Sequence, residues 1–371
     1  MVRVAVLINE LSSTSIPLEI AVKVHRTTNV EVLIISYFDM PGDDIDPDIE
    51  ELQLPVLRLG ADSRIDLSAL SRIREVCKND DVSILHTHHN STGSLARLAI
   101  FGTGTQVVNT EHNDHRFFTT LQKTANSATY KIIDYNVSNS QSTKDSFAWY
   151  ERLLLNGLLN GVEQRVIYNG IDKERIDSAS RPSVDLPDGP NITIVGSITE
   201  QKNHETALRA FKTVNDTVPE SSLIVVGGGA LSENLQNTST KLGLQNDVLF
   251  TGYLPRRDDV YGVLKKSEIA VFPSWYEGFC VAAVEAMAAG LPVVVSDIDV
   301  FHEVVGDPGV FADPNDPEAF ADEIIDLLQH PKKRELLGQE AKERARSEFS
   351  LERTAREYSN LYKEVAERAN R

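Results

Sequence analysis

Two glutamates in the second half of the chain have a setting typical of a ligand-binding site. They lie in the segment 272–297, FPSWYEGFCVAAVEAMAAGLPVVVSD, where a strand ends, a turn follows and a helix is expected over 279–289. Glu285 is the single charge of this otherwise apolar helix, and a helix that is apolar on every side is buried. A buried carboxylate needs hydrogen-bond partners. We therefore expect Glu285 either to accept hydrogen bonds from a ribose diol, as acidic residues do in dinucleotide sites, or to pair with a Lys or Arg from the opposite half.

The second glutamate, Glu277, lies in the turn just before the same helix. A carboxylate there can simply interact with the helix dipole. However, Gly278 beside it lets a ligand approach the backbone closely, and the amides of Phe279 and Cys280 start the helix, where an anion or a sugar can bind. From the residues alone, the two glutamates are either structural carboxylates or part of a site that binds a ribose and an anion or a sugar.

The residues of this segment resemble the donor-site signature of family 4 glycosyltransferases, which have the GT-B fold. The resemblance rests on Glu-Gly-Phe at 277–279, then five residues, then Glu-Ala-Met-Ala-x-Gly-x-Pro-Val-Val. Other stretches resemble further segments of the family: Val-Gly and Glu-Gln-Lys-Asn within 195–203 (phosphate contact), Val-Val-Gly-Gly-Gly at 225–229 (glycine loop), Phe-Thr-Gly-Tyr at 250–253 (base pocket), Tyr-Asn-Gly-Ile-Asp at 168–172 (hinge side) and 107–112 (a strand ending in an active-site histidine). The resemblance covers nearly the whole chain and is strongest in 190–315.

This resemblance implies a role for each matching position. Lys202 neutralises the leaving diphosphate, Glu277 holds hydroxyls of the transferred sugar, and His112 lies over that sugar from the other domain; these three are the catalytic candidates. Glu285 holds the ribose. The implied donor-binding set is Gly196, Ser197, Lys202, Gly227, Tyr253, Leu254, Glu277, Gly278, Phe279, Cys280 and Glu285. The donor is a UDP-, GDP- or ADP-sugar, transfer retains the anomeric configuration, and no metal or other cofactor takes part, because a cation and helix N-termini stabilise the leaving diphosphate.

Two positions depart from the family pattern. Ser197 stands where the family usually has an arginine, so one phosphate-binding charge is missing. The first loop reads Leu-Ser-Ser-Thr-Ser at 11–15 instead of carrying a Gly-Gly pair, and the hydroxyls of Ser12 and Ser13 are the expected acceptor-side contacts there. In the run LHTHHN, His88 is a further acceptor-side candidate, and the spacing of its histidines does not indicate a metal site.

The elements that must position these residues alternate between strands and helices. Buried-strand runs are expected at 2–8, 30–36, 82–85, 107–109 and 132–137, and again at 192–195, 223–226, 248–250, 269–272 and 292–295. Strands alternating with helices predict parallel sheets with right-handed crossovers. The fold class is therefore α/β, with two Rossmann-like, doubly wound domains facing across a cleft and ligands at the carboxyl ends of the strands.

The expected domains are an N-terminal, acceptor-side domain over 1–180 and a C-terminal, nucleotide-sugar domain over 181–349. A stretch rich in Pro, Ser and Asp over 177–190 is expected to link them. The remaining segment, 350–371, is helical in period and is expected to pack back on the N-terminal domain.

Composition limits the partners and the compartment. The 371 residues carry a formal net charge of −18, which argues against nucleic acid because a phosphate backbone requires a basic surface. No apolar run approaches the roughly 18 residues of a membrane span, the N-terminus lacks the features of a signal peptide, and two distant cysteines give no disulfide framework. We expect a cytoplasmic, acidic protein with at most peripheral contact to the inner face of a membrane.

The leading hypothesis is a retaining, metal-independent glycosyltransferase that moves a sugar from a nucleotide diphosphate to a glycan or lipid-linked acceptor. One alternative is a nucleotide-sugar epimerase on the same scaffold, which needs an acid/base pair at the sugar ring. The other is a nucleotide-sugar-binding regulatory protein that has lost its catalysis, as Ser197 allows.

Overall fold

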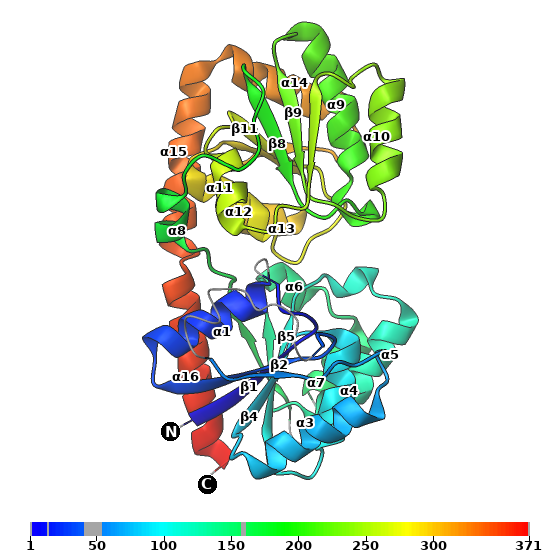
Figure 1. The fold of residues 1–371 in the computed structure, drawn as a ribbon, viewed down its shortest axis with the longest axis vertical. Helices are drawn as coiled ribbons and strands as arrows, with labels where there is room; N and C mark the ends of the chain where they lie inside the picture. Colours follow the sequence, from blue (N-terminus) through cyan, green and yellow to red (C-terminus); the bar gives the residue numbers. More distant parts are fainter. Residues whose placement is uncertain (1, 13–14, 41–53, 157–160, 370–371) are drawn as a thin grey trace. The chain divides into compact units, whose positions relative to one another are not determined.

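The chain folds into two compact α/β units. The computed structural model describes residues 2–12, 15–40, 54–156 and 161–369. Unit 1 comprises the chain up to Gly170 together with the stretch from Leu351 onward, and unit 2 comprises Ile171–Ser350 (Figure 1). The division falls earlier in the chain than the expected boundary at 180, because the short helix α8 (Lys173–Ser178) packs on helices of unit 2.

Unit 1 is built on a seven-stranded parallel sheet with the order β3-β2-β1-β4-β5-β6-β7. Its strands are β1 (Val2–Ile8), β2 (Val30–Ser36), β3 (Val56–Arg58), β4 (Ile84–Thr87), β5 (Gln106–Glu111), β6 (Tyr135–Ser138) and β7 (Glu163–Val166). The strand order reverses at β1 and β4, and ligands of doubly wound sheets bind at the carboxyl ends of the strands at such a point.

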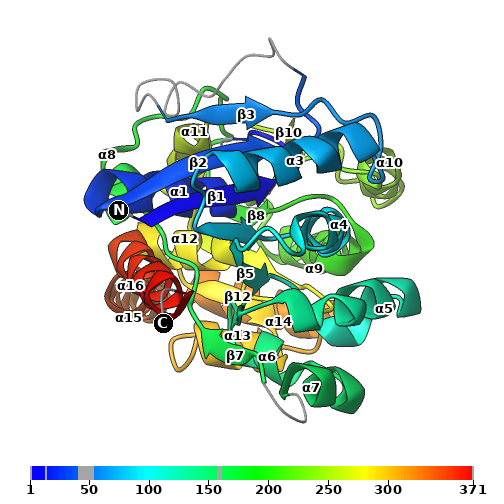
Figure 2. The same cartoon turned by 90° about the horizontal axis from the view of Figure 1, so that it is seen from below.

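Helices cover both faces of this sheet. On one face α1 (Ile16–Thr27) packs beside the terminal helix α16 (Leu351–Ala369), and on the other lie α3 (Leu67–Asn79), α4 (Asn90–Ile100), α5 (Thr120–Ala128) and α7 (Trp149–Asn156) (Figure 2). The short helix α6 (Gln141–Asp145) follows β6. Each face has its own apolar core, which explains why the central strands are continuous apolar runs.

Unit 2 contains a six-stranded parallel sheet with the order β10-β9-β8-β11-β12-β13. The strands are β8 (Asn191–Val195), β9 (Ser222–Val226), β10 (Val248–Gly252), β11 (Ile269–Phe272), β12 (Val293–Ser296) and β13 (Val310–Ala312). One face is covered by α9 (His204–Thr217), α10 (Ser232–Lys241) and α14 (Pro317–Gln329), and the other by α11 (Arg257–Leu264), α12 (Val281–Ala289) and α15 (Pro331–Glu348) (Figure 1). The helix α13 (Asp299–Val304) connects β12 to β13. The order reverses between β8 and β11.

The apolar runs predicted the central strands correctly but missed three edge strands. β3, β7 and β13 have three or four residues each, and several of their side chains are partly exposed. A strand with one neighbour and half-exposed side chains needs no continuous apolar run, so its sequence carries a weak signal.

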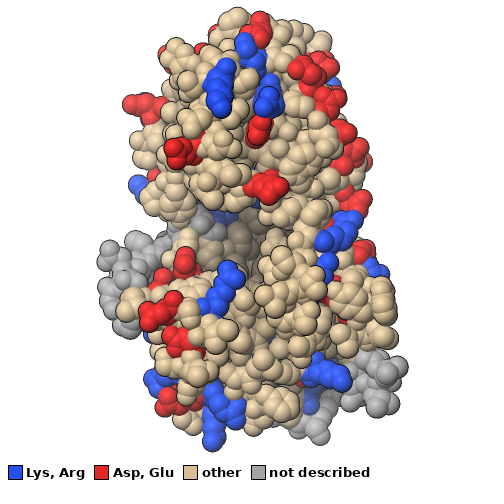
Figure 3. All heavy atoms as spheres, turned by 90° about the vertical axis from the view of Figure 1, so that its right-hand side faces the viewer, with Lys and Arg blue, Asp and Glu red and all other residues tan. Residues whose placement is uncertain are grey.

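Charged side chains of both signs are mixed on one face of the molecule. On the face shown in Figure 3, Lys and Arg side chains stand singly or in small groups among Asp and Glu. Among the helices of the described chain, none combines the length and hydropathy that crossing a membrane requires.

Candidate functional site

Lys202 and Glu277 meet at the switch point of unit 2. Lys202 ends the 3-10 turn η3 (Glu200–Lys202) that follows β8, and Glu277 lies between β11 and α12. Lys202 Nζ lies 2.5 Å from Glu277 Oε1, and the hydroxyl of Ser274 donates to the same oxygen at 2.8 Å. The Glu277 side chain is 5% exposed and the Lys202 side chain 22%, so the cation reaches solvent while the carboxylate is enclosed.

Backbone contacts fix the two turns against each other. The amide of Trp275 donates to Gln201 O at 2.9 Å, and Gln201 Nε2 donates to Tyr276 O at 3.0 Å. Asn203, in the left-handed conformation with φ 50°, donates from Nδ2 to Pro273 O at 3.0 Å. The geometry of the Lys202–Glu277 pair is thus set by hydrogen bonds to main-chain carbonyl groups as well as by the ion pair.

The charge state of Lys202 follows from its neighbours. Burial acts to lower its pKa, but the carboxylate of Glu277 outweighs burial and raises the pKa above the ordinary value. Burial also raises the pKa of the Cys280 thiol, and Glu277 raises it further. At neutral pH the site therefore holds a fixed positive charge beside a neutral thiol.

The strand ends next to this pair approach each other closely, which only glycine permits. Gly227, after β9, has φ 133°, and a Cβ there would lie 2.1 Å from the carbonyl oxygen of Gly196. Its amide donates to Gly252 O at 3.0 Å, linking the ends of β9 and β10. Beyond β10, Tyr253 is exposed and Leu254 is buried. These strand ends also lie next to Lys202, because a Cβ at Gly196 would be 3.7 Å from its side-chain carbons.

Ser197 and the start of α12 complete the set expected in unit 2. Ser197 is exposed in the turn after Gly196, and its hydroxyl is the only polar group that its side chain offers. The helix begins at Val281, two residues later than expected, because Cys280 adopts the left-handed conformation with φ 64°. Gly278 and Phe279 are buried between Glu277 and the helix.

Glu285 is held by residues of its own unit. Arg257 donates from Nε to Glu285 Oε1 at 2.8 Å and forms a second bond from its terminal nitrogen to the same oxygen. The hydroxyl of Tyr261 donates to Oε1 at 3.0 Å. The expectation of a partner from the opposite half is wrong: Arg257 is on α11, which packs against α12. Residue spacing could not reveal this partner, because only the packing of two helices brings it there.

In unit 1 the histidines after β4 and β5 form a pair. His88 Nδ1 lies 2.9 Å from His112 Nε2, and the rings stack with centroids 5.2 Å apart. Burial lowers the pKa of both, to about 4 for His112, so both rings are neutral at pH 7. His86, in contrast, is tied into the core through Tyr362 at 2.7 Å and Thr110 at 2.8 Å.

Behind His112 lies a buried charge cluster that sequence reasoning missed. His115 Nδ1 is 3.0 Å from Glu151 Oε1, and its Nε2 is 3.3 Å from Glu111 Oε2, a contact that is mainly electrostatic. Burial acts to lower the pKa of His115, but the two carboxylates raise it to about 9. Burial acts to raise the pKa of Glu111, but His115, Asn126 and Arg97 bring it to about 2. The cluster fixes the turn that carries His112.

The first loop of unit 1 is described only in part. Leu11 N donates to Asp39 Oδ2 at 2.6 Å, and Ser12 O accepts from Ser15 N at 2.9 Å. Ser13 lies outside the described residues. Within the described ranges, His, Cys, Asp and Glu side chains form no group of three suited to a metal ion.

Two family models match consecutive parts of the chain. The model described as "Glycosyltransferase Family 4" matches residues 21–175, and the one described as "Glycosyl transferases group 1" matches residues 177–344. The second match contains every candidate residue from Gly196 to Glu285, and the first contains His88 and His112.

Similar proteins support the same family. An uncharacterised glycosyltransferase of Methanocaldococcus jannaschii is 30% identical over 220 residues, covering 56% of this chain and 55% of that protein. An Escherichia coli α-1,3-galactosyltransferase named for UDP-galactose and a GlcNAc-diphosphoundecaprenol acceptor is 26% identical over 306 residues, covering 76% of each.

Solved structures share the fold at low identity. The Anabaena protein HepE, in a crystal with UDP and glucose, superposes with a TM-score of 0.80 at 16% identity, covering 98% of this chain and 100% of that one. Sucrose-phosphate synthase of Thermosynechococcus elongatus superposes with a TM-score of 0.79 at 19% identity, covering 98% of this chain and 99% of that one.

Proposed function

Because this chain is a family 4 glycosyltransferase with the GT-B fold, we propose that it transfers a sugar from a nucleotide diphosphate sugar to a glycan or lipid-linked acceptor, with retention of configuration and without a metal ion. The observation that carries the proposal is the Lys202–Glu277 pair at the switch point of unit 2, 2.5 Å apart. A cation beside an enclosed carboxylate matches a substrate with a diphosphate next to a ring of hydroxyls.

Lys202 supplies the charge for the leaving group. The bond between the anomeric carbon and the phosphate oxygen breaks while negative charge grows on the diphosphate. A fixed ammonium group in a partly dry site stabilises that charge far more than water does. Because Ser197 offers only a hydroxyl where the family pattern has an arginine, Lys202 is the cation assigned to this task.

Glu277 orients the sugar. Ser274 and Lys202 hold its Oε1, while Oε2 lies 3.5 Å from Gln201 Nε2, at the limit of a hydrogen bond. Oε2 is thus the oxygen with the most capacity to accept from sugar hydroxyls. The acceptor hydroxyl attacks the anomeric carbon on the face from which the diphosphate leaves, and its proton passes to the leaving phosphate oxygen, so that configuration is retained.

Glu285 and the residues after β10 hold the nucleoside. The hydrogen bonds that Arg257 and Tyr261 donate to Glu285 all reach Oε1, and Oε2 makes no hydrogen bond to the part of the chain that the structure describes. We assign Oε2 to the ribose hydroxyls and the surface at Tyr253 and Leu254 to the base. In unit 1, neutral His112 is assigned to the transferred sugar, with His88 setting which ring nitrogen carries the proton.

The test is release of nucleotide diphosphate from UDP-, GDP- and ADP-sugars with EDTA present, tried first with UDP-glucose and UDP-galactose. Glu277→Ala and Lys202→Ala should lower the rate by about 10²–10³ each. Lys212→Ala is the matched control, because Lys212 forms an exposed pair with Asp216 on α9 and should keep full activity. The anomeric configuration of the product, read by NMR, tests retention.

Three results would contradict the proposal. Loss of activity in EDTA, restored by a divalent cation, would refute metal independence. A changed sugar still attached to its nucleotide would indicate an epimerase. An intact donor after long incubation with every donor and acceptor would favour a binding protein.

A further inference from the structure

Exposed apolar side chains gather on one side of unit 1. Figure 1 and Figure 2 both show α4, α5 and α7 in a row on this side. Of the thirteen large apolar side chains that are exposed in the described residues, seven lie within 98–154: Leu98, Phe101, Phe117, Leu121, Trp149, Leu153 and Leu154. This stretch is less than a sixth of the 371 residues, so the exposed apolar surface is concentrated here. Such a concentration marks an interaction site.

Contacts around His115 bring two of these segments together. The His115 ring stacks on Phe147 with centroids 3.9 Å apart, and its Nδ1 lies 3.0 Å from Glu151 Oε1. The 3-10 turn η1 (His115–Phe117) therefore lies against the start of α7, and α5, which follows η1, packs beside α7. We call the exposed apolar side chains of these three elements the η1–α7 patch: Phe117, Leu121, Trp149 and Leu153.

The packing of unit 1 leaves this patch uncovered. Trp149 and Leu153 lie one turn apart on the outer face of α7, because Glu151 and Leu155 occupy its buried face. Trp149 is 77% exposed and Leu121, in the first turn of α5, is 79% exposed. The helices thus pack through their other faces, and the apolar outer faces are available to a partner.

Charge sets this side apart from the rest of the chain. Residues 90–156 contain six Lys and Arg against five Asp and Glu, whereas the whole chain carries −18. Three of the five carboxylates are buried: Glu111, Asp114 and Glu151. Asp134 precedes β6, at the opposite edge of the sheet from η1, which leaves Asp145 as the exposed carboxylate of this stretch nearest the patch. Figure 3 looks onto this side, and much of the surface of unit 1 there carries no charged side chain.

Cations border the patch. Lys123 Nζ lies 3.5 Å from Arg116 O, and Arg152 Nε donates to Phe147 O at 2.9 Å. Both contacts are to main-chain carbonyl groups, so they leave the two positive charges unneutralised. Arg116 adds a third cation, paired with the buried Asp114 at 2.7 Å. Aromatic and leucine side chains edged by cations are typical of a surface that enters the headgroup region of an anionic bilayer. A second copy that used the same face would bring like charges together.

From these observations we propose that the η1–α7 patch binds the surface of a bilayer that contains anionic lipids. Its apolar side chains enter the boundary between headgroups and acyl chains, and Lys123 and Arg152 lie at the lipid phosphates. The turn that carries His112 leads directly into η1, so a lipid-linked acceptor would be met beside that histidine. This link to the acceptor rests on the proposed function, whereas binding to the bilayer does not.

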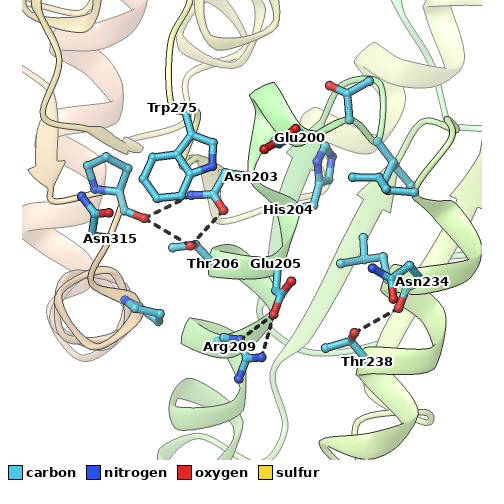
Figure 4. Close-up of a pocket in the computed structure, with 16 residues that line it drawn as sticks. Glu200, Asn203, His204, Glu205, Thr206, Arg209, Asn234, Thr238, Trp275 and Asn315 are labelled. Atoms are coloured by element: carbon cyan, nitrogen blue, oxygen red, sulfur yellow. Dashed lines mark hydrogen bonds and ion pairs between the residues drawn. The ribbon is translucent and has the colours of Figure 1, made fainter.

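The experiment uses the fluorescence of Trp149. The sequence contains two tryptophans, and the other one, Trp275, lines a pocket of unit 2 together with Glu200 and Glu205 (Figure 4). In the full chain with Trp275→Phe, Trp149 is the only tryptophan. Vesicles of phosphatidylcholine alone, or of phosphatidylcholine mixed with phosphatidylglycerol, are titrated in. The mixed vesicles should give a saturable blue shift of the Trp149 emission and quenching by brominated lipid. No shift, or equal binding to both kinds of vesicle, overturns the proposal.

Variants at exposed positions locate the binding by co-sedimentation with the mixed vesicles. The double variant Leu121→Gln, Leu153→Gln should bind about tenfold more weakly or worse, and Lys123→Gln about fivefold more weakly at low salt. Leu336→Gln is the matched control, because Leu336 is an exposed leucine on α15 of unit 2, and it should bind like the parent. Unchanged binding in the patch variants, or an equal loss in the control, overturns the proposal.

Two further measurements separate this proposal from its alternatives. A dimer in sedimentation velocity that the double variant dissociates, together with no binding to vesicles, would place a second copy of the chain on the patch and overturn the proposal. A chain that binds vesicles but releases no nucleotide diphosphate would support the patch and refute only the proposed function. A chain that is active on a soluble acceptor but does not bind vesicles would overturn the patch and leave the proposed function in place.

Discussion

The buried cluster around His115 makes the stability of unit 1 dependent on pH in a defined direction. His115 lies between Glu111 and Glu151, and all three side chains are almost fully buried. Its pKa in the folded chain is about 9, against an ordinary value of 6.5. The folded state thus keeps a proton that the unfolded chain has lost, so this stabilisation is complete below pH 6.5 and disappears as pH rises through 9.

The magnitude follows from the same two values. Each unit of pKa corresponds to about 1.36 kcal/mol, so the rise of the His115 pKa on folding corresponds to roughly 3 kcal/mol of unfolding free energy. His115→Gln removes the titrating group and keeps a polar side chain. The parent should therefore be more stable than the variant near neutral pH. The gap in unfolding free energy between parent and variant should narrow by roughly 3 kcal/mol as pH rises to about 10.

Hydrogen exchange read by mass spectrometry measures this gap for unit 1 alone, through peptides of β5 and α7. Comparing parent and variant at the same pH cancels the intrinsic exchange rates. His86→Gln is a control of opposite sign, because burial lowers the pKa of His86 to about 3. The gap in unfolding free energy between the parent and His86→Gln should narrow only as pH falls below 6.5. A His115→Gln gap that stays constant across the alkaline range would refute the reasoning.

Three further predictions test other parts of the site. Gly227→Ala forces a Cβ against the Gly196 carbonyl at positive φ and should lower the unfolding free energy of unit 2 by about 3 kcal/mol or more in urea denaturation. Gly243→Ala is the control, because Gly243 also has a positive φ but no atom lies near its Cβ, and it should cost only about 1–2 kcal/mol. Equal losses in the two variants would contradict the steric cause. Arg257→Met should lower the unfolding free energy by about 3–5 kcal/mol, because it leaves the Glu285 carboxylate buried and unpaired. Adding Glu285→Leu should recover most of this lost stability in thermal melts, and additive losses in the double variant would argue against the ion pair. If His88 orients His112, His88→Phe should lower kcat about tenfold in steady-state kinetics and leave the donor KM unchanged. An unchanged kcat would rule out this role for His88.

The sequence predicted the fold well because both sheets are buried on both faces. Central strands such as β1 and β8 are then apolar throughout, and the helix that carries Glu285 is visible as an apolar stretch ended by Gly290. The edge strands were not predicted because their side chains are partly exposed, so their sequences need not be continuous apolar runs.

Prediction of the site was uneven for a related reason. The turns that carry Glu277 and Lys202 have recognisable motifs in the sequence, and the structure brings the two side chains together because these turns follow adjacent strands of the sheet. The partners of Glu285 and His115 come from helices packed against their own, and no local pattern encodes that packing.

The return of α16 to unit 1 has a consequence for synthesis of the protein. Its residues Leu351, Tyr358, Leu361 and Tyr362 belong to the same core as β1 and α1, whereas unit 2 is one uninterrupted stretch of chain. During translation the earlier-made unit therefore waits with one side of its sheet covered by α1 but not by α16, until residues 351–369 leave the ribosome, while the later-made unit can close first. Chaperones should bind this protein mainly at the part of the sheet that α16 later covers.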